Sequence, residues 1–398
     1  MKKSIRTFLK HPIKDKSNRS ANPPVIRAST ILFDSMQELY KHEKRIKQHQ
    51  KITHYSYGRY GSSTTIELEN ILKELEQAFH VFLTGTGFGG VALAIMSLCR
   101  PGDEILVSDN VYGPTKEISE KLLKEFDVKA IFYNPDSFKD LKDKVSKKTK
   151  MILVENPGSN TFEFQDLSKI VNLAKKKKIF SFLDNTWGTP LYLKPLKIGF
   201  DMSFSSATKY FSGHSDAMGG SLAVNKKVFK KIMFFYKLSG YRMSADEAYL
   251  IIRGIRTLDT RLTQHYDNTI KVIKFLKKQK KIKEILYPVN PSSKNYKLWK
   301  KYYSGATGLF SVVIKSKNKS SVIKFVNSLE LFGIGYSWGG FESLALLQEL
   351  RSSKKDEYLQ GRNFYRFKKD EHIVRLHIGL EDPKDLISDL KQSLRYIK

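Results

Sequence analysis

Cysteine is almost absent: the 398-residue chain has only Cys99. One cysteine cannot form an intramolecular disulfide and cannot supply the ligands of a cysteine-based zinc cluster. The chain also lacks a run of about 18 apolar residues, the length that a helix needs to cross a bilayer, and its charged start lacks the apolar stretch of a signal peptide. These absences predict a reduced, cytoplasmic protein that neither spans nor binds a membrane.

Acidic residues are few: 40 Asp and Glu stand against 70 Lys and Arg, a formal net charge of +30. Polycations gain affinity for nucleic acids by releasing counterions from phosphates, so a nucleic-acid partner has to be considered. The lysines, however, form scattered pairs and short runs such as 175–178 and 277–281, without a recognition-helix, zinc-finger or RNP pattern. We interpret them as solvated helix faces and expect no specific nucleic-acid partner.

Alternating apolar runs and helical patterns fill the middle of the chain. Short apolar runs typical of buried strands occur at 104–107, 130–133, 151–155, 179–183 and 202–205. Helical patterns lie before and between them, at 91–99, 115–126 and 166–177, with a further apolar series at Leu68, Ile71, Leu72, Leu75 and Phe79. This alternation predicts an α/β domain with a mostly parallel sheet.

The ends of the chain have a different character. Residues 1–60 are polar with little periodicity, which predicts an arm, and residues 61–256 contain the α/β pattern. The stretch 258–281 is helical, and we expect it to lead into a C-terminal α+β domain, 257–398. In that domain we expect strands at 309–314 and 374–378 and helices at 320–329 and 383–397. Asp382 is the expected cap of the last helix, with Pro383 at its first position.

Lys209 is the first residue that points to chemistry. It follows an apolar strand and small hydroxyl-bearing residues, and a buried ammonium is costly, so we expect its pKa to be lowered or its amine to be covalently engaged. Such an amine forms an imine with an aldehyde cofactor. Alone, a lysine after a strand is more often a solvent-facing residue. Asp184 adds weight, because it ends another apolar strand, where ligands of open parallel sheets bind.

The segment 84–90, Thr-Gly-Thr-Gly-Phe-Gly-Gly, opens an expected helix. Glycines allow backbone amides to approach an anion at a helix N-terminus, although a plain tight turn is the commoner meaning of such a segment. It lacks the dinucleotide-binding pattern and suits a single phosphate better. A fixed carboxylate such as Asp184 keeps a pyridine nitrogen protonated. Aldehyde, pyridine nitrogen and phosphate together specify pyridoxal 5′-phosphate (PLP).

Several motifs resemble one family, the PLP-dependent enzymes of Cys/Met metabolism, over nearly the whole chain. They are 207–216, similar to the family's cofactor-lysine signature, and 250–258, similar to its connector motif. The segments 57–61, 184–187 and 337–343 favour the beta-lyase branch over gamma-synthases and gamma-lyases. The resemblance implies a PLP-dependent transferase-like fold (aspartate aminotransferase fold type I): a large α/β domain with a mostly parallel, seven-stranded sheet and a smaller α+β C-terminal domain.

The resemblance also implies roles for individual residues. Lys209 would bind PLP covalently and move protons, Asp184 would pair with the ring nitrogen, and Tyr112 would stack on the ring and assist catalysis. The implied phosphate ligands are the amides of Gly87 and Phe88, the hydroxyls of Ser206 and Thr208, and Tyr57 and Arg59 of a neighbouring subunit. The implied substrate contacts are Arg375, Ser337, Trp338 and Ser159, the last at a position where many relatives have Asn. No metal site is expected.

The implied activity is β-elimination from a small-molecule substrate, L-cystathionine or a related cysteine S-conjugate, in methionine biosynthesis. A dimer, pairing further into a dimer of dimers, is the implied assembly. Alternatives within the family are cystathionine gamma-synthase, gamma-lyase and a promiscuous cysteine S-conjugate beta-lyase. A more distant alternative is a basic binding protein without catalysis; the joint presence of Lys209, Asp184, Tyr112 and Arg375 argues against it.

Overall fold

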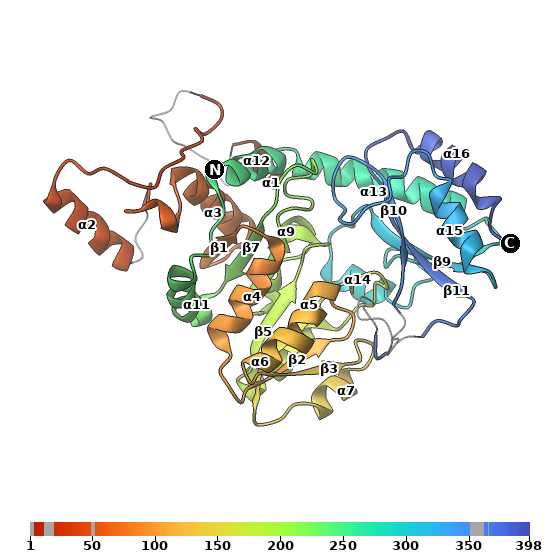
Figure 1. The fold of residues 1–398 in the computed structure, drawn as a ribbon, viewed down its shortest axis with the longest axis horizontal. Coiled ribbons are helices and arrows are strands. Elements are labelled where there is room, and N and C mark those ends of the chain that lie inside the picture. Colours follow the sequence, from red (N-terminus) through yellow and green to blue (C-terminus); the bar gives the residue numbers. More distant parts are fainter. Residues whose placement is uncertain (1–3, 12–19, 49–51, 351–361, 365) are drawn as a thin grey trace.

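The computed structural model describes residues 4–11, 20–48, 52–350, 362–364 and 366–398. Its two sheets lie side by side, each covered by helices (Figure 1). The larger sheet has seven strands in the order β1 (His80–Thr84), β7 (Gly220–Val224), β6 (Met202–Ser206), β5 (Phe180–Asp184), β4 (Thr149–Glu155), β2 (Glu104–Ser108) and β3 (Lys129–Tyr133). Strand β7 is antiparallel to both neighbours, and all other pairs are parallel. The predicted α/β architecture with seven strands is confirmed.

The first two thirds of the chain supply the helices around this sheet. They are α1 (Ile5–Lys10), α2 (Met36–Lys47), η1 (Gly58–Tyr60), α3 (Ser63–Glu76), α4 (Gly87–Leu98), α5 (Gly113–Glu117), the π-helical turn η2 (Ile118–Leu122), α6 (Leu123–Glu125), α7 (Phe138–Asp143), α8 (Leu167–Lys177), α9 (Thr189–Tyr192), α10 (Pro195–Ile198), α11 (Lys226–Ser239) and α12 (Ala245–Ile255). Polar caps fix several starts; Thr86, for example, accepts a hydrogen bond from the Gly89 amide at the start of α4.

The smaller sheet is antiparallel, in the order β10 (Leu344–Gln348), β11 (Glu371–His377), β9 (Leu309–Lys315) and β8 (Ile282–Leu286). Its helices are α13 (Leu258–Leu276), α14 (Tyr296–Tyr302), α15 (Lys319–Asn327) and α16 (Pro383–Leu394). Asp382 caps α16 and Pro383 stands at its first position, as the sequence predicts. The domain boundaries at 60/61 and 256/257 stay a prediction.

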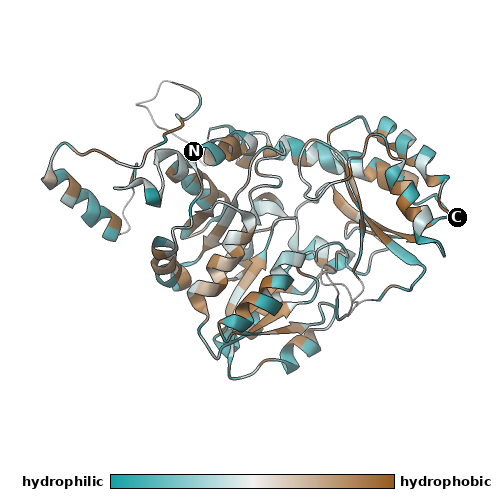
Figure 2. Ribbon diagram, in the orientation of Figure 1, coloured by the Kyte–Doolittle hydropathy of each residue, from teal (hydrophilic) through white to brown (hydrophobic). Residues whose placement is uncertain are grey.

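Alternation along the strands divides the core into layers. In β1, Phe82 packs on one face of the large sheet with α4 and α11, whereas Val81 and Leu83 pack on the other with α3 and α12. A third apolar cluster runs from α8 and the large sheet into the small sheet. Figure 2 shows the brown, apolar residues gathered on the strands and on the inward helix faces. This continuous core holds the two sheets next to each other.

Two local predictions are wrong. Phe79 does not continue α3: Gln77 ends that helix with a left-handed backbone (φ 54°), and the Phe79 amide donates to Val224 O at the sheet edge. The helix expected over 258–281 ends at Leu276, because no apolar residue extends its buried stripe before β8. Within the stretch predicted to be an arm, the structure has one further helix, α2, that the sequence pattern did not indicate.

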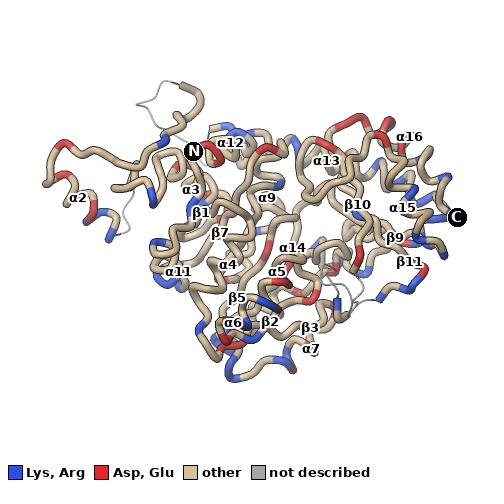
Figure 3. The backbone as a smooth tube through the Cα atoms, viewed as in Figure 1, with Lys and Arg blue, Asp and Glu red and all other residues tan. Residues whose placement is uncertain are grey.

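Charged residues are distributed over the whole described chain. Figure 3 shows Lys and Arg spread over helices and loops around both sheets rather than gathered on one element. Several are paired with carboxylates, such as Lys227 with Asp201 and Arg366 with Glu284. No helix among the described residues is long and apolar enough to cross a membrane.

Candidate active site

The carboxyl ends of β4, β5 and β6 bring polar residues to one edge of the large sheet. Glu155 ends β4 directly opposite Asp184, the last residue of β5, and Ser206 ends β6 beside them. Lys209 follows in the turn after β6. The sheet therefore places the predicted cofactor lysine and the predicted partner of the ring nitrogen at one site, at the edge where such folds bind ligands.

The turn that carries Lys209 packs closely against helix α12 and is hydrogen-bonded to Arg261 of α13. Helix α12 approaches it so closely that a Cβ on Gly254 would lie 2.1 Å from Ser212 O. Arg261 donates from Nη2 to the carbonyls of Tyr210 (2.8 Å) and Gly254 (2.7 Å). The lysine backbone is thereby fixed, and only its side chain has freedom to move.

The Lys209 amine is adapted to nucleophilic chemistry. Burial, and next the nearby Arg375 guanidinium, lower the pKa of Lys209 to about 8, although Asp184 acts in the opposite direction. Its Nζ donates to Ser337 Oγ at 2.5 Å and lies 5.6 Å from the centroid of the Trp338 ring. No ion pair joins it to a carboxylate in the part of the chain that the structure describes. The neutral, nucleophilic form of the amine is therefore more accessible than in an ordinary lysine.

Asp184 is held by Thr186. Its Oδ1 accepts hydrogen bonds from the Thr186 amide (2.9 Å) and hydroxyl (2.5 Å), and Thr186 Oγ1 in turn accepts from the Ser206 amide. Its Oδ2 has no hydrogen bond among the described residues. Burial raises the pKa of Asp184, and the Thr186 hydrogen bonds and Lys209 oppose that rise. One carboxylate oxygen is thus fixed and the other is available to a ligand.

Glu155 holds the backbone of Tyr112. The Tyr112 amide donates to Glu155 Oε2 at 2.6 Å. Burial and the neighbouring Asp184 raise the pKa of Glu155 well above its usual range. Burial, and next Glu155, also raise the pKa of Tyr112, which keeps its phenol protonated at neutral pH. Tyr112 is 49% exposed, so part of its surface is accessible to a ligand.

The start of α4 contains two of the residues predicted to bind the phosphate. Gly87 and Phe88 occupy its first turn, where backbone amides have no partner within the helix. A Cβ on Gly87 would lie 2.5 Å from Ser206 Oγ, so only glycine allows this approach. The Thr208 hydroxyl, in the turn that carries Lys209, exchanges hydrogen bonds with the backbone of Gly219. Amides and hydroxyls suited to an anion therefore gather next to Lys209.

The small sheet contributes the predicted substrate residues through β11. Arg375 is 9% exposed and donates from Nη2 to Ser337 O at 3.0 Å. Two residues on, the ring Nε2 of His377 lies 3.1 Å from the Gly339 amide. Ser337 has a left-handed backbone (φ 80°), and these two contacts hold the loop that presents it to Lys209. Trp338 packs against the Tyr210 ring, 5.4 Å away between centroids.

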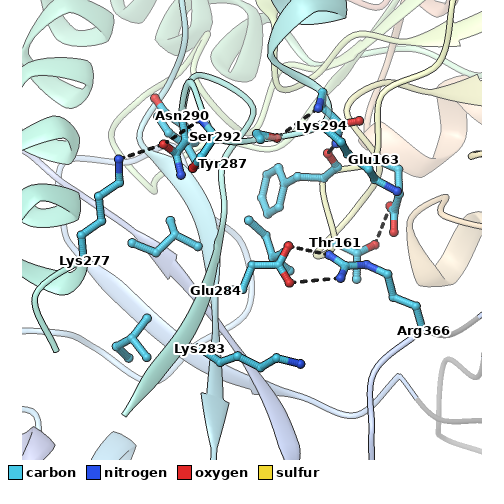
Figure 4. A pocket seen from close by; sticks show the side chains of 16 residues that line it. Thr161, Glu163, Lys277, Lys283, Glu284, Tyr287, Asn290, Ser292, Lys294 and Arg366 are labelled. Atoms are coloured by element: carbon cyan, nitrogen blue, oxygen red, sulfur yellow. Dashed lines mark hydrogen bonds and ion pairs between the residues drawn. The ribbon is translucent and has the colours of Figure 1, made fainter. Parts of the chain in front are cut away.

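Ser159 lies in a loop on the opposite side of the site. A narrow cavity of about 20 Å³ is lined by Glu155, Ser159, Asp184, Trp338 and Arg375, among others. The loop itself follows a cis peptide bond between Asn156 and Pro157. Phe162, in the same loop, lines both this cavity and a larger cleft of about 590 Å³ behind it. The larger cleft, seen in Figure 4, contains none of the predicted cofactor residues.

Tyr57 and Arg59 are not brought to this site within the chain. They line another cleft with Arg27 and Asp246, and Arg59 lies over the Tyr57 ring at 5.7 Å. Tyr57 is 47% exposed. Their predicted role concerns a neighbouring subunit and stays a prediction.

Comparison with known proteins gives the family. The model of the family "Cys/Met metabolism PLP-dependent enzyme" matches residues 7–395. The chain belongs to this family. The cystathionine beta-lyase of Bordetella avium is 35% identical over 98% of both chains. The L-alanine/L-glutamate racemase of Wolbachia pipientis wMel is also 35% identical, over 94% of this chain and 92% of its own.

Among solved structures, the cystathionine gamma-lyase of Lactobacillus plantarum, complexed with L-serine, is 25% identical with a TM-score of 0.87 and covers 99% of both chains. The fold is that of PLP-dependent enzymes of fold type I, and the cofactor is PLP. The residues fit it, because Lys209 has an amine without a carboxylate partner among the described residues, Asp184 has an oxygen without a hydrogen bond there, and the first-turn amides of α4 lie beside the Ser206 hydroxyl.

The sequence prediction missed residues that the structure places at this site. Glu155 is adjacent to Asp184, and an acidic residue at the end of an apolar strand was a signal that could have found it. Thr186 stands two residues after Asp184, the spacing at which an Asp side chain accepts from the backbone. His377 and Arg362 act through contacts with distant segments and left no local signal.

Proposed function

We propose that this chain is a cytoplasmic carbon–sulfur lyase that cleaves L-cystathionine by β-elimination, a step of methionine biosynthesis. The overall change takes cystathionine and water to homocysteine, pyruvate and ammonia. The observation that carries the proposal is the buried Lys209 amine, which donates a hydrogen bond to Ser337 Oγ, lies near Asp184 and Arg375, and has a lowered pKa. The beta-lyase names of relatives such as that of Bordetella avium support the choice of reaction.

The residues divide the work by their chemistry. Bound PLP supplies an electron sink that makes the substrate Cα proton acidic. Asp184, whose Oδ2 has no hydrogen bond among the described residues, would hold the pyridine nitrogen in its charged form. Lys209 takes the proton from Cα and delivers one to the departing sulfur, for which a pKa near neutrality is suited.

Arg375 binds the α-carboxylate, because its guanidinium can make paired, charge-assisted hydrogen bonds and is already oriented by Ser337 O. Gly87, Phe88, Ser206 and Thr208 hold the phosphate. Tyr112 covers the ring face, and Trp338 and Ser159 border the substrate. We also propose that Tyr57 and Arg59 complete the phosphate site of a neighbouring subunit, so that the active unit is a dimer.

Product analysis on L-cystathionine tests the proposal. We expect stoichiometric homocysteine and pyruvate, and at least about a 100-fold loss of turnover in Lys209→Ala, because that variant lacks the group that moves the proton. Cysteine with 2-oxobutyrate would contradict β-elimination and assign a gamma-lyase instead.

Amino-acid racemisation is a second candidate. The Wolbachia racemase is as similar to this chain as the beta-lyases are, and Tyr112, whose raised pKa keeps its phenol protonated, would supply a second acid–base group beside Lys209's. Incubation with L-alanine and L-glutamate, followed by chiral analysis, separates the two reactions. Formation of D-isomers faster than cystathionine cleavage would favour the racemase.

A further inference from the structure

Arg362, about 200 residues after Ser159 in the chain, holds the Ser159 loop by hydrogen bonds. Arg362, 7% exposed, donates from Nη2 to Ser159 O and from Nη1 to Thr161 Oγ1 at 2.5 Å. Its guanidinium also lies 3.7 Å from Glu163 Oε2. Thr161 Oγ1 donates to the same carboxylate at 2.6 Å. One arginine therefore ties three residues of a single loop together.

The two residues after Arg362 hold the loop that leads to Tyr112. Asn363 Nδ2 and the Phe364 amide donate to the two carboxylate oxygens of Asp109, at 3.0 and 2.9 Å. The next residue, Asn110, accepts the Ser159 amide on its carbonyl at 2.8 Å. The segment 362–364 thus fixes the Ser159 loop and the loop before Tyr112, and these are bonded to each other.

The Ser159 loop needs such support. Asn160 and Phe162 have left-handed backbones (φ 65° and 55°), and for a bulky residue such as Phe162 this conformation persists only when its surroundings impose it. Asn295 Nδ2 adds a hydrogen bond to Phe162 O at 3.0 Å. Figure 4 shows the rear of the loop, with Glu163 and Thr161 hydrogen-bonded beside the larger cleft.

Arg362 is attached to the edge of the sheet that carries Arg375. The Arg362 amide donates to Leu350 O at 3.0 Å, just beyond β10, and β10 pairs directly with the Arg375 strand β11. The distance between Ser159 and Arg375 is therefore set in part through Arg362. Ser159 and Arg375 line the narrow cavity in which the substrate carboxylate is proposed to bind.

We propose that Arg362 is a positioning residue that sets the substrate-carboxylate site by fixing Ser159 relative to Arg375. This inference rests on the proposed function only in taking that cavity as the amino-acid site. An arginine is required because its planar fork reaches a carbonyl and a hydroxyl at once, which a lysine ammonium at the same place does less well.

The test compares Arg362→Gln with Arg366→Gln. Arg366 is the matched control, because it lies four residues away and makes a bidentate ion pair, but with Glu284 of the small sheet and not with the Ser159 loop (Figure 4). In Arg362→Gln we expect the KM for the amino-acid substrate to rise about tenfold or more, the effect of losing a charge-assisted hydrogen bond, with kcat within about threefold. Arg366→Gln should match wild type in both constants.

Two further measurements separate positioning from general damage. The Kd of PLP for the apoprotein, from quenching of tryptophan fluorescence, should stay within about twofold of wild type in Arg362→Gln, because the phosphate cradle and Asp184 are not among its contacts. Arg362→Lys should have a KM between those of wild type and Arg362→Gln. If Arg362→Gln does not fold, Thr161→Val removes the hydroxyl that Arg362 reaches and should raise KM in the same way by a smaller factor.

An unchanged KM in the folded variants overturns the proposal. So does a parallel loss of PLP affinity and kcat, since that pattern assigns Arg362 to stability alone. The proposed reaction can fail separately: if wild type releases cysteine or D-amino acids, the KM comparison is made on that substrate and still decides the role of Arg362.

Discussion

At the scale of single residues, the site works by moving two ionisation equilibria in opposite directions. The pKa of the Lys209 ammonium is lowered to about 8 by burial and Arg375, while burial raises the pKa of Asp184. The amine therefore becomes neutral, and able to attack an aldehyde, at a pH more than two units below that of a free lysine. Burial raises the pKa of Asp184 only to about 6, because the Thr186 hydrogen bonds and Lys209 oppose the effect of burial. Asp184 therefore stays ionised near pH 8.

This leads to a prediction for cofactor uptake. Because only the neutral amine reacts, the rate at which apoprotein binds PLP covalently should rise with pH, with a midpoint near pH 8. Stopped-flow absorbance between pH 6 and about 10 measures this rate, with Lys209→Ala as the control that binds PLP only noncovalently. A rate that keeps rising towards the pKa of an ordinary lysine, about 10.4, would contradict the lowered pKa.

Sequence alone located the residues that follow apolar strands. Lys209 and Asp184 were predictable because buried parallel strands are continuous apolar runs and polar residues at their ends gather at one edge. Arg362 was not predictable, since its acceptors lie about 200 residues earlier in the chain and only the folded structure brings them together. The same holds for His377, whose partner is the Gly339 amide.

At the scale of elements, regular patterns were predicted well and interrupted ones were not. All five strands deduced from apolar runs are present, within one or two residues. Strands β1 and β7 were missed: each lies next to a glycine-rich segment, and β7 itself begins with Gly220 and Ser221. Helix α2 was missed although Ser35 and Glu38 have the spacing of a capping pair, because the polar stretch around them has few apolar residues.

The loops at the site are the elements least visible in sequence. Ser337 and Phe162 adopt left-handed backbones that their residue types do not favour. Each is imposed from outside its own loop, by Arg375 and His377 in one case and by Arg362 and Asn295 in the other. The geometry of the substrate pocket therefore depends on how the small sheet packs against the large one.

At the scale of the whole molecule, the arm is the feature that the single chain does not explain. Helix α2 projects away from the rest of the fold (Figure 1), with Leu32 before it 89% exposed and Tyr40 within it 66% exposed. Tyr57 and Arg59, at the base of the arm, have no contact with Lys209 of their own chain among the described residues. An arm that completes the site of a second copy accounts for all three observations.

Complementation between inactive variants tests this. Arg59→Ala and Lys209→Ala should each lose most activity alone, the first because it lacks a phosphate ligand. Co-expressed, they should regain about a quarter of wild-type activity, since half of the dimers are mixed and each mixed dimer has one intact site. Arg59→Ala with Tyr57→Phe, both in the arm, is the matched pair that should not complement. If the co-expressed Arg59→Ala and Lys209→Ala chains regain no activity, a site shared between two subunits is contradicted.

The chemistry proposed for every other residue requires PLP to be joined to one particular amine. Reduction of the holoprotein with borohydride fixes that bond, and proteolysis with mass spectrometry then locates the added pyridoxyl group. The peptide containing Lys209 should carry the group, at close to one equivalent per chain, and Lys209→Ala should carry none. A label on a different lysine, or a wild-type protein without label after incubation with PLP, would contradict the account.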